Sequence, residues 1–480
     1  MSISGQVHSA EIASPPRWHY LRSRKVMPAL LSLVFVTRVV YALLYVNIKG
    51  AQNLFESDIN DYFTLAESLL HGSFTYNGVP NLGRTPGYPL LLAPAVWSGH
   101  VVFFGILENI ALAVFAAWVL ARIADYLFPR TAVATWAVLL YCFEPIGFLY
   151  STLLLSESLF AALFLVFVWL VIRFLHEPSR TLVLPALVLS AATYTRPVGL
   201  FFSIWMIPFL LLFPRRLAVR QRLVKTAAFG AVFAISLAPW IVRNAAVADY
   251  RGFASVGEIG LYFYSAASIQ AKLEGKSFSQ ELIDMGFWSD KSYFEVHPEQ
   301  RSWSQGKVYH FMRSEALRIV GQHWPSYLPI HARGCAVFLF DTAATRILRE
   351  VKLYPQEGGL LGRVIDQGVF RGLLWLIREY PVTAILFVLL AIQLILYYLL
   401  ALVGLRAFPL GVACFFFWTT AYFVLVCGGP IGHGRYRMPL MPLVCLSAGA
   451  TLARRTLRSR SPDEVSAATR SLMPDRPVAL

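Results

Sequence analysis

The stretch ESDINDYF, residues 56–63, gathers three carboxylates in a chain of which only 14% of the residues are charged. It directly follows the first long apolar run. A carboxylate can accept a proton as a general base, bind a cation or cap the start of a helix. Asp58 and Asp61 are three residues apart, so on a helix they would share its polar side near the N-terminus. We therefore take Asp58 and Asp61 as candidate catalytic residues, with helix capping as the alternative.

Five arginines near the ends of apolar runs could bind an anion. A guanidinium group offers paired N–H donors that match the oxygens of a phosphate. Arg84 could instead only anchor the turn before Pro86, and Arg243 could simply end a span. For Arg243, Arg435 and Arg437, an outward position goes against the positive-inside pattern of the topology given below, which supports a functional role. The candidate phosphate-binding residues are Arg84, Arg196, Arg243, Arg435 and Arg437.

Other residues could support such a site. Glu157 could hold Arg196 by charge pairing, whereas the alternative for Tyr88, and the more common role of such a residue, is interfacial aromatic packing. His433 with Asp58 and Asp61 could bind a divalent metal ion, although the spacing does not prove it and a histidine there is more often a surface residue. No cofactor is certain. The supporting residues are Tyr62, Tyr88, Glu157, Asn244 and Tyr436.

Several ionisable residues lie inside apolar runs, where a charge is costly and tends to be functional or paired. Under the topology given below, Glu108, Glu144, Glu157 and Arg196 lie toward the outer ends of their helices, and Arg38 lies in the outer half of the first span. This asymmetry favours one polar site that opens on the outer side. The alternative is that these side chains only snorkel or pair.

The composition requires that membrane helices position these residues. Hydrophobic residues make up 57% of the chain, the mean hydropathy is +0.57, and apolar stretches of about 20 residues recur. These features predict an all-α polytopic membrane protein with about ten transmembrane helices. Two of them are short and meet at Arg196-Pro197, which leaves the number open. The expected spans are 26–46, 101–121, 131–150, 153–174, 181–196, 198–213, 226–242, 381–404, 408–427 and 436–452.

Basic residues set the expected orientation. The formal net charge is +15, and Lys and Arg cluster in short connections such as 215–225 and 454–460. This pattern is typical of cytoplasmic loops and argues against nucleic-acid binding. Both termini are then cytoplasmic, and the candidate active site is extracytoplasmic, in a multi-pass protein of the plasma (inner) membrane. The outer segments are 47–100, 243–380 and 428–437.

The expected organisation is a short cytoplasmic segment, 1–25, a transmembrane domain, 26–455, and a cytoplasmic tail, 456–480, that we expect to be disordered. The transmembrane domain includes the outer loops 47–100 and 243–380. The five cysteines form no CxxC pair, so neither a disulfide framework nor a zinc site is indicated.

The outer loops themselves carry structure. From Ser57 the apolar residues follow helical spacing up to a natural stop at Gly72, which predicts an amphipathic helix on the membrane surface. Residues 86–97 are too short to span the membrane, and 243–380 should form a partly helical domain packed over it. The apolar positions of the amphipathic helix are Ile59, Tyr62, Phe63, Ala66, Leu69 and Leu70.

Six short motifs together resemble the polytopic GT-C glycosyltransferases, over about residues 30 to 455. The nearest likeness is to bacterial members of glycosyltransferase family 39, akin to protein O-mannosyltransferases and to the transferases that put aminoarabinose on lipid A. The family usually places an acidic pair after the first span, whereas the acids here are spread as E-S-D-I-N-D. The motifs are the stretch Asp58 to Gly72, RTPGYPLLLA (84–93), LLSESLF (154–160), YTRPVGLFF (194–202), PWIVRN (239–244) and GRYRMPLMPL (434–443).

The resemblance implies a GT-C-like fold and transfer of a hexose or pentose from a polyprenyl-phosphate donor to an acceptor on the outer face. Asp58 matches the family aspartate, because Tyr62 and Ala66 follow at the right steps, and Asp61 is its rival. That aspartate would be the base or a metal ligand, and the arginines would hold the donor phosphate. The implied partners are the lipid-linked sugar, membrane lipids and an acceptor lipid, glycan or protein.

Two other functions stay open. A transporter or flippase of lipid-linked saccharides would need polar residues at mid-membrane and often internal repeats, and neither is visible here. A ligase that joins a preassembled glycan to a lipid would share the outer-face site and the lipid phosphate chemistry. The length of the donor glycan would separate the ligase from a monosaccharide transferase.

Overall fold

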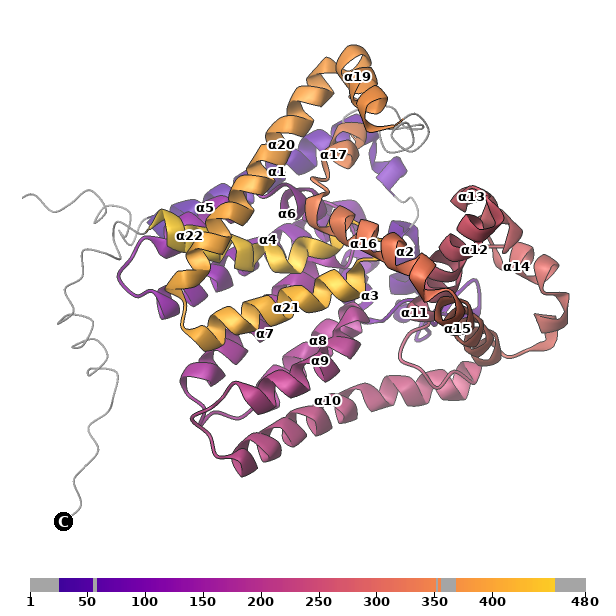
Figure 1. Ribbon diagram of the computed structural model, residues 1–480, viewed down its shortest axis with the longest axis horizontal. Helices are drawn as coiled ribbons and strands as arrows, with labels where there is room; N and C mark the ends of the chain where they lie inside the picture. The colour runs from indigo at the N-terminus through magenta and orange to yellow at the C-terminus, as the bar shows by residue number, and fades with distance from the viewer. Residues whose placement is uncertain (1–25, 55–57, 351–352, 355–367, 454–480) are drawn as a thin grey trace, which may run out of the picture.

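The computed structural model describes residues 26–54, 58–350, 353–354 and 368–453. Helices make up nearly all of its secondary structure (Figure 1), with one two-stranded hairpin, β1 (Thr75–Tyr76) and β2 (Val79–Pro80). The predicted all-α class is therefore confirmed. Glu56 and the sequence expectations for 1–25 and 456–480 lie outside the described residues.

Among the described residues, six helices are long and apolar enough to cross a membrane. An α-helix rises 1.5 Å per residue, so about 20 residues cover the hydrocarbon core of a bilayer. Together with their apolar composition, these helices make the chain a multi-pass membrane protein. The six are α1 (Val26–Lys49), α4 (Val101–Leu127), α7 (Glu157–His176), α10 (Val219–Ala248), α20 (Pro381–Gly404, continued by the 3-10 helix η5, Leu405–Ala407) and α21 (Leu410–Cys427).

Four expected spans are shorter in the structure than the sequence suggested, so the number ten stays a prediction. The expected span 131–150 is divided near Glu144, whose carboxylate caps the next helix by accepting hydrogen bonds from Ile146 N and Gly147 N. Pro145 then occupies the first helical position, where its missing N–H costs nothing. The shorter helices are α5 (Val133–Cys142), α6 (Pro145–Tyr150), α8 (Val183–Thr195), α9 (Val198–Leu212) and, after the 3-10 helix η6 (Gly434–Leu440), α22 (Met441–Leu452).

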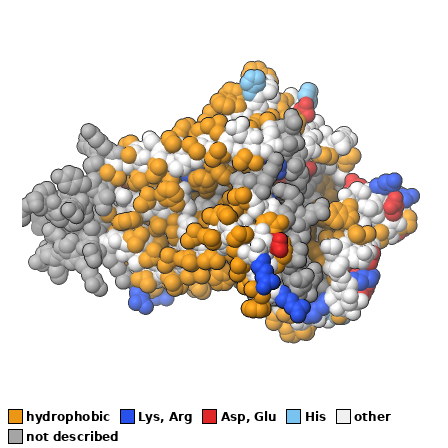
Figure 2. Space-filling view, turned by 90° about the horizontal axis from the view of Figure 1, so that it is seen from above, with side chains coloured by type: hydrophobic (Ala, Val, Ile, Leu, Met, Phe, Trp, Pro, Cys, Tyr) orange, Lys and Arg blue, Asp and Glu red, His pale blue; other side chains and the backbone are white. Residues whose placement is uncertain are grey.

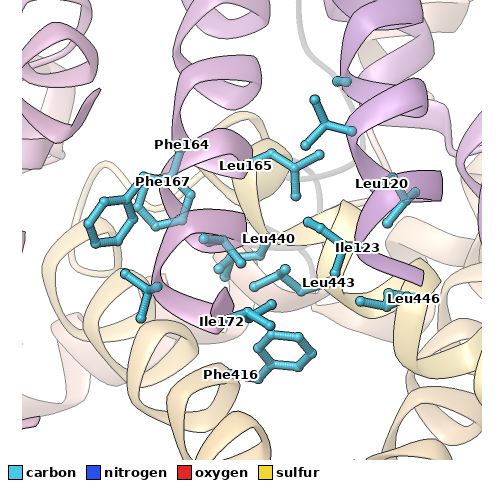
Figure 3. Close-up of a cluster of buried hydrophobic side chains, with 14 of the residues drawn as sticks. Leu120, Ile123, Phe164, Leu165, Phe167, Ile172, Phe416, Leu440, Leu443 and Leu446 are labelled. Atoms are coloured by element: carbon cyan, nitrogen blue, oxygen red, sulfur yellow. The ribbon is translucent and has the colours of Figure 1, made fainter. Parts of the chain in front are cut away.

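A large hydrophobic cluster joins helices from both halves of the chain. Figure 3 shows side chains of α4, α7, α21 and α22 meeting in this core, among them Leu120, Phe164, Phe416 and Leu443. Other hydrophobic side chains cover the outside of the bundle, whereas charged side chains gather at the end formed by the helices between α10 and α16 (Figure 2). This distribution suits a body embedded in lipid with a polar end.

The segment 47–100, which we expect to be the first outer loop, folds in outline as predicted. The 3-10 helix η2 (Ala51–Leu54) precedes α2 (Asp58–Leu70), and the loop ends with α3 (Gly87–Trp97), against which α2 packs. Of the expected apolar positions of α2, Ile59, Tyr62 and Ala66 are buried, but Leu70 is 43% exposed. Leu65, which is not among those positions, is buried. Gly72, with a φ of 73°, takes the left-handed conformation that ends the helix.

The described residues of the segment 243–380, which we expect to be the second outer segment, are largely helical, as predicted. Most of its helices gather at one end of the molecule in Figure 1 and share a hydrophobic cluster that includes Tyr262, Met285 and Met312. The segment thus has a small core of its own. Its helices are α11 (Val256–Gly260), the π-helix η3 (Leu261–Ala266), α12 (Ala267–Glu274), α13 (Phe278–Asp284), α14 (Asp290–Val296), the 3-10 helix η4 (Pro298–Ser302), α15 (Gln305–Gln322), α16 (Trp324–Phe340), α17 (Ala344–Glu350) and α19 (Val369–Glu379).

Glycines let α16 lie directly against the loop before η6. A Cβ added at Gly334 would lie 1.6 Å from the carbonyl oxygen of Gly429, and one added at Gly432 would lie 2.2 Å from the carbonyl oxygen of Gly334. No side chain fits between two backbones this close. The contact fixes where η6, with its two arginines, starts.

Gly334→Ala is expected to lower the melting temperature of the detergent-purified protein, because the new methyl group must push α16 away from residues 429–432. Overpacking of this kind typically costs about 1–3 kcal/mol. Gly321→Ala is the matched control, since a Cβ there has nothing within 4 Å and alanine favours a helix. Equal melting temperatures for the two variants would contradict the close contact.

Candidate active site

Five separate segments bring the candidate site together. Asp58 and Asp61 lie in the first turn of α2, and Arg84 lies in the loop between β2 and α3. Glu157 begins α7, and Arg196 is the residue that follows α8. Arg435 lies in η6.

The start of α3 and the end of α8 touch directly. A Cβ added at Gly87 would lie 2.6 Å from the carbonyl oxygen of Tyr194, so only glycine allows this approach. The contact draws the loop of Arg84 toward Arg196. The glycine of the RTPGYP motif therefore has a packing role in the site.

Three carboxylates and three arginines alternate in one continuous ion-pair network. Arg84 Nη2 lies 2.5 Å from Asp58 Oδ1 and 2.9 Å from Asp61 Oδ2. Arg435 Nη1 lies 2.8 Å from the other oxygen of Asp58, and its Nε donates to Glu157. The order of the ion-pair network is Asp61, Arg84, Asp58, Arg435, Glu157 and Arg196, the last pair at 2.5 Å.

The ion-pair network is exposed at one end and closed at the other. The side chains of Asp61 and Asp58 are 36% and 31% exposed, whereas that of Glu157 is 2% exposed. Arg435 and Arg196, at 15% and 17%, lie between these extremes. A ligand would therefore reach the network from the side of α2, and the Glu157 end would act as its fixed base.

Tyrosine rings frame the arginines. The guanidinium of Arg84 lies 5.3 Å from the ring centroid of Tyr62, that of Arg196 lies 5.4 Å from Tyr436, and that of Arg435 lies 5.8 Å from Tyr150. A cation at this distance is attracted to the face of a ring.

Hydrogen bonds fix Tyr62 and the neighbouring Tyr88. The hydroxyl of Tyr62 lies 2.9 Å from Ser156 Oγ, and its ring meets that of Tyr88 edge-on at 5.1 Å. Tyr88, predicted to be either supporting or packing, is buried and accepts a hydrogen bond from Asn109 at 3.1 Å. The tyrosines thus hold α2 and α3 against α4 and α7.

Burial and the charges of the network shift the pKa of Asp58 in opposite directions. Burial alone would raise the pKa of this carboxyl, but the charges and hydrogen bonds of Arg84 and Arg435 hold the pKa well below its usual range. The same carboxylates outweigh burial at both arginines, whose pKa values rise. In this arrangement Asp58 is ionised and is a weak base.

This shift predicts how the stability of the fold responds to acid. A carboxyl whose pKa is lower in the folded state stabilises the fold above its unfolded pKa, about 3.9 for Asp, and loses that effect as the pH falls toward its folded pKa. Wild-type protein should therefore melt at a higher temperature than Asp58→Asn at neutral pH. The gap should shrink as the pH is lowered below about 4. Thermal melts of both proteins across this range test it, and a gap independent of pH would contradict it.

The other candidate arginines serve the surrounding chain in this structure. Arg437 is buried and donates to the carbonyl oxygens of Phe338, Leu339 and Asp341, at 2.7, 2.5 and 2.8 Å, where α16 ends. A cation is favourable at a helix C-terminus, whose last carbonyls lack partners. Arg437 is therefore not part of the ion-pair network, although Arg435 is only two residues away.

The side chains of Arg243 and Asn244 donate hydrogen bonds to backbone carbonyl oxygens of two neighbouring loops. Arg243 donates to the carbonyl oxygens of Asn81, at 3.2 Å, and Phe74, at 2.8 Å. Asn81 Oδ1 in turn accepts from Arg84 N at 2.8 Å, so Arg243 supports the loop that carries Arg84. Asn244 Nδ2 donates to two carbonyl oxygens of the turn that follows α10, at 3.0 Å each.

His433 lies beside the network but does not meet the aspartates of α2. Its Nδ1 is 3.4 Å from Asp341 Oδ2 and accepts from Arg435 N at 3.0 Å. Burial lowers the pKa of His433. Within the described part of the chain, no three His, Cys, Asp or Glu side chains gather where they could hold a metal ion. The residues do not fit the sequence hypothesis of a metal site from Asp58, Asp61 and His433.

The buried ionisable residues of the spans divide into two groups. Glu157 and Arg196 belong to the ion-pair network. Arg38 is fully buried and donates to the carbonyl oxygens of Tyr141 and Cys142 at the end of α5, and Glu144 caps α6. For Arg38 and Glu144 the structure thus shows pairing, one of the alternatives that the sequence left open, and the partners are backbone groups.

Some neighbours of the site carried no clear sequence signal. Arg346, in α17, donates to the hydroxyl of Tyr150 at 3.1 Å, on the same ring that Arg435 covers. Ser156 links Tyr62 to Arg196, whose Nη1 lies 3.5 Å from Ser156 Oγ. Ser156 lies inside the motif LLSESLF and could have been included, whereas Arg346 stands in a segment without periodic pattern.

No protein-family model and no curated protein matches the chain. Among solved structures, the chain is similar to the oligosaccharyltransferase AglB of Archaeoglobus fulgidus, in a complex with an inhibitory peptide and a dolichol-phosphate, with a TM-score of 0.43, 12% identity and coverage of 92% of this chain and 52% of that one. The apo form of the Archaeoglobus fulgidus oligosaccharyltransferase gives a TM-score of 0.43, 10% identity and coverage of 93% and 53%. The chain thus spans about half the length of these structures, and the peptide and the dolichol-phosphate are ligands of that protein.

Proposed function

We propose that this protein is a membrane glycosyltransferase that moves a hexose or pentose from a polyprenyl-phosphate donor to an acceptor on the extracytoplasmic face. The observation that carries the proposal is the ion-pair network. It places a partly exposed carboxylate, Asp58, between two guanidinium groups beside helices that span a membrane. A phosphate and a proton donor are the two chemical partners that such a group of residues suits.

The transfer needs one bond to form and one to break. The acceptor oxygen or nitrogen attacks the anomeric carbon of the donor sugar, and its proton passes to the carboxylate of Asp58. The bond between the anomeric carbon and the phosphate oxygen breaks, and its electron pair leaves with the polyprenyl phosphate. Because a phosphate is a good leaving group, the site needs cations to stabilise its charge rather than a general acid.

The ion-pair network supplies those cations through an exchange of partners. Arg84 Nη2 and Arg435 Nη1 now bind the carboxylate of Asp58, at 2.5 and 2.8 Å. A donor phosphate would take over these N–H groups. As its counterions turn to the phosphate, the pKa of Asp58 rises toward its ordinary value and the carboxylate becomes a better base. Glu157, which is 2% exposed, stays in place and keeps Arg435 and Arg196 oriented.

The remaining candidates position this group. Arg243 holds the loop of Arg84, and Arg437 anchors η6 to the end of α16. Tyr62 and Tyr436 lie under Arg84 and Arg196 and keep those guanidinium planes from turning freely. The lipid chain of the donor would lie against the apolar exterior of the bundle (Figure 2).

The proposal is tested by the release of free polyprenyl phosphate. Purified protein in vesicles of native lipid receives a panel of polyprenyl-phosphate monosaccharides together with an extract that contains acceptors. Release from one donor, coupled to the appearance of its sugar on an acceptor, is expected. Movement of an intact donor across the vesicle membrane without release would instead identify a flippase, and release only from donors with long glycans would identify a ligase.

A further inference from the structure

A cavity of about 450 Å³ lies between the start of α8 and the start of α10. The cavity lies at the end of α8 opposite to the ion-pair network, because Arg196, a member of the network, follows the last residue of α8. Leu182, Val183, Val224 and Ala228 form its apolar walls. A cavity of this size at the end of membrane-spanning helices is large enough to hold a small molecule or a lipid headgroup.

The cavity carries positive charge that no carboxylate of the described residues neutralises. Arg220 lines it, and its side chain makes no hydrogen bond or ion pair with the described part of the chain. Lys225 also lines it, and its Nζ donates only to carbonyl oxygens, those of Ser179 at 3.3 Å and Arg180 at 2.8 Å. The nearby Glu177 is paired with Arg180 at 2.5 Å. The opening therefore attracts an anion.

Apolar side chains lead away from the cavity along both helices. On α8, Val183 is 39% exposed and Leu187, one turn on, is 45% exposed. On α10, Val224 is 61% exposed and Ile235, three turns on, is 71% exposed. A ligand bound here would thus have an anionic head in the cavity and an apolar body along the helices.

We infer that this cavity binds an anionic phospholipid. Arg220 and Lys225 contact the phosphate of its headgroup, and its acyl chains lie along the exposed faces of α8 and α10. Basic pockets between membrane helices are suited to such headgroups. A free phosphate ion would leave the apolar walls unused, and a zwitterionic lipid would bring a second positive charge next to Arg220. This inference does not depend on the proposed enzyme activity.

The test is native mass spectrometry of the full-length protein in detergent, titrated with phosphatidylglycerol or with phosphatidylcholine that has the same acyl chains. Binding of phosphatidylglycerol should be stronger, and Arg220→Gln should weaken it about fivefold, since a cation at a membrane surface contributes about 1 kcal/mol. Arg216→Gln, which removes the same charge outside the cavity, is the matched control and should bind as wild type does. Ala228→Trp, which fills the cavity and keeps the charge, should also weaken binding.

Three results would overturn the inference. Equal loss in Arg216→Gln and Arg220→Gln would mean that the general charge of the loop attracts the lipid. Equal binding of the two lipids would remove the role of the anionic headgroup. Full competition by inorganic phosphate at concentrations similar to those of the lipid would identify a phosphate ion site. Melting temperatures equal to wild type exclude misfolding as the cause of any loss.

Discussion

Asp58→Asn is expected to reduce the release of polyprenyl phosphate by about 10²- to 10⁴-fold, the range that a positioned general base contributes. Asparagine has nearly the same shape and keeps one oxygen that can accept from Arg84 or Arg435. It cannot take the proton of the acceptor. The loss should therefore appear in kcat, with little change in the KM for the donor, whose phosphate still meets both arginines.

Asp61→Asn is the matched control for this variant. Asp61 lies on the same helix turn and has the same chemistry, but it contacts Arg84 alone and lies at the exposed end of the ion-pair network. We expect a loss of less than about tenfold, the effect of one weakened ion pair at a partly exposed site. A larger loss in Asp61→Asn than in Asp58→Asn would exchange the roles of the two residues.

Asp58→Glu separates a chemical role from a structural one. A glutamate keeps a carboxylate of similar pKa on a longer side chain, so part of the turnover should return, and the acid limb of the pH–rate profile should persist. Asp58→Asn should lack that limb. Full turnover in Asp58→Asn, with the protein correctly folded, would show that Asp58 is not the base.

The sequence predicts the membrane helices and the helix of Asp58 well, because their signals are local. A run of apolar residues identifies a span by itself, and the spacing of Ile59, Tyr62 and Ala66 identifies the buried face of α2. The sequence predicts the burial of single side chains less well, because this depends on how the helices pack against each other. Leu65 is buried and Leu70 is 43% exposed, although the helical spacing places Leu70 and not Leu65 on the apolar face.

The pairing of the charged residues could not be predicted, because it depends on contacts between distant segments. Arg435 and Asp58 are 377 residues apart in sequence, and Arg435 and Glu157 are 278 apart. The pattern R-Y-R gives no sign that its two arginines differ. In a 3-10 helix, however, each residue turns by about 120°, so residues two apart point to different sides. Arg435 therefore meets the carboxylates, and Arg437 meets the end of α16.

This difference gives the second prediction, in which the same substitution affects donor binding at one arginine and stability at the other. Arg435→Lys should lower kcat/KM for the donor by about 10- to 100-fold, because one or two charge-assisted hydrogen bonds to the phosphate are lost. A lysine keeps the positive charge between Asp58 and Glu157 but cannot donate from two nitrogens in one plane. The melting temperature should fall only modestly.

Arg437→Lys should show the reverse. Its guanidinium donates to three carbonyl oxygens at the end of α16 from a buried position, and a single ammonium group cannot reproduce that geometry. We expect a lower melting temperature and, in the protein that stays folded, a KM for the donor equal to that of wild type. Donor titrations and thermal melts of both variants provide the four measurements.

The two variants together decide whether the ion-pair network is a binding site or only a structural element. If the arginines of η6 serve the fold alone, both substitutions lower the melting temperature and neither changes the KM. If Arg437 holds the phosphate, its variant raises the KM and Arg435→Lys does not. Only an increase in the KM confined to Arg435→Lys fits a donor phosphate that replaces Asp58 as the partner of Arg435. Such an exchange needs an accessible ion pair, and Asp58, the partner of Arg435, is 31% exposed.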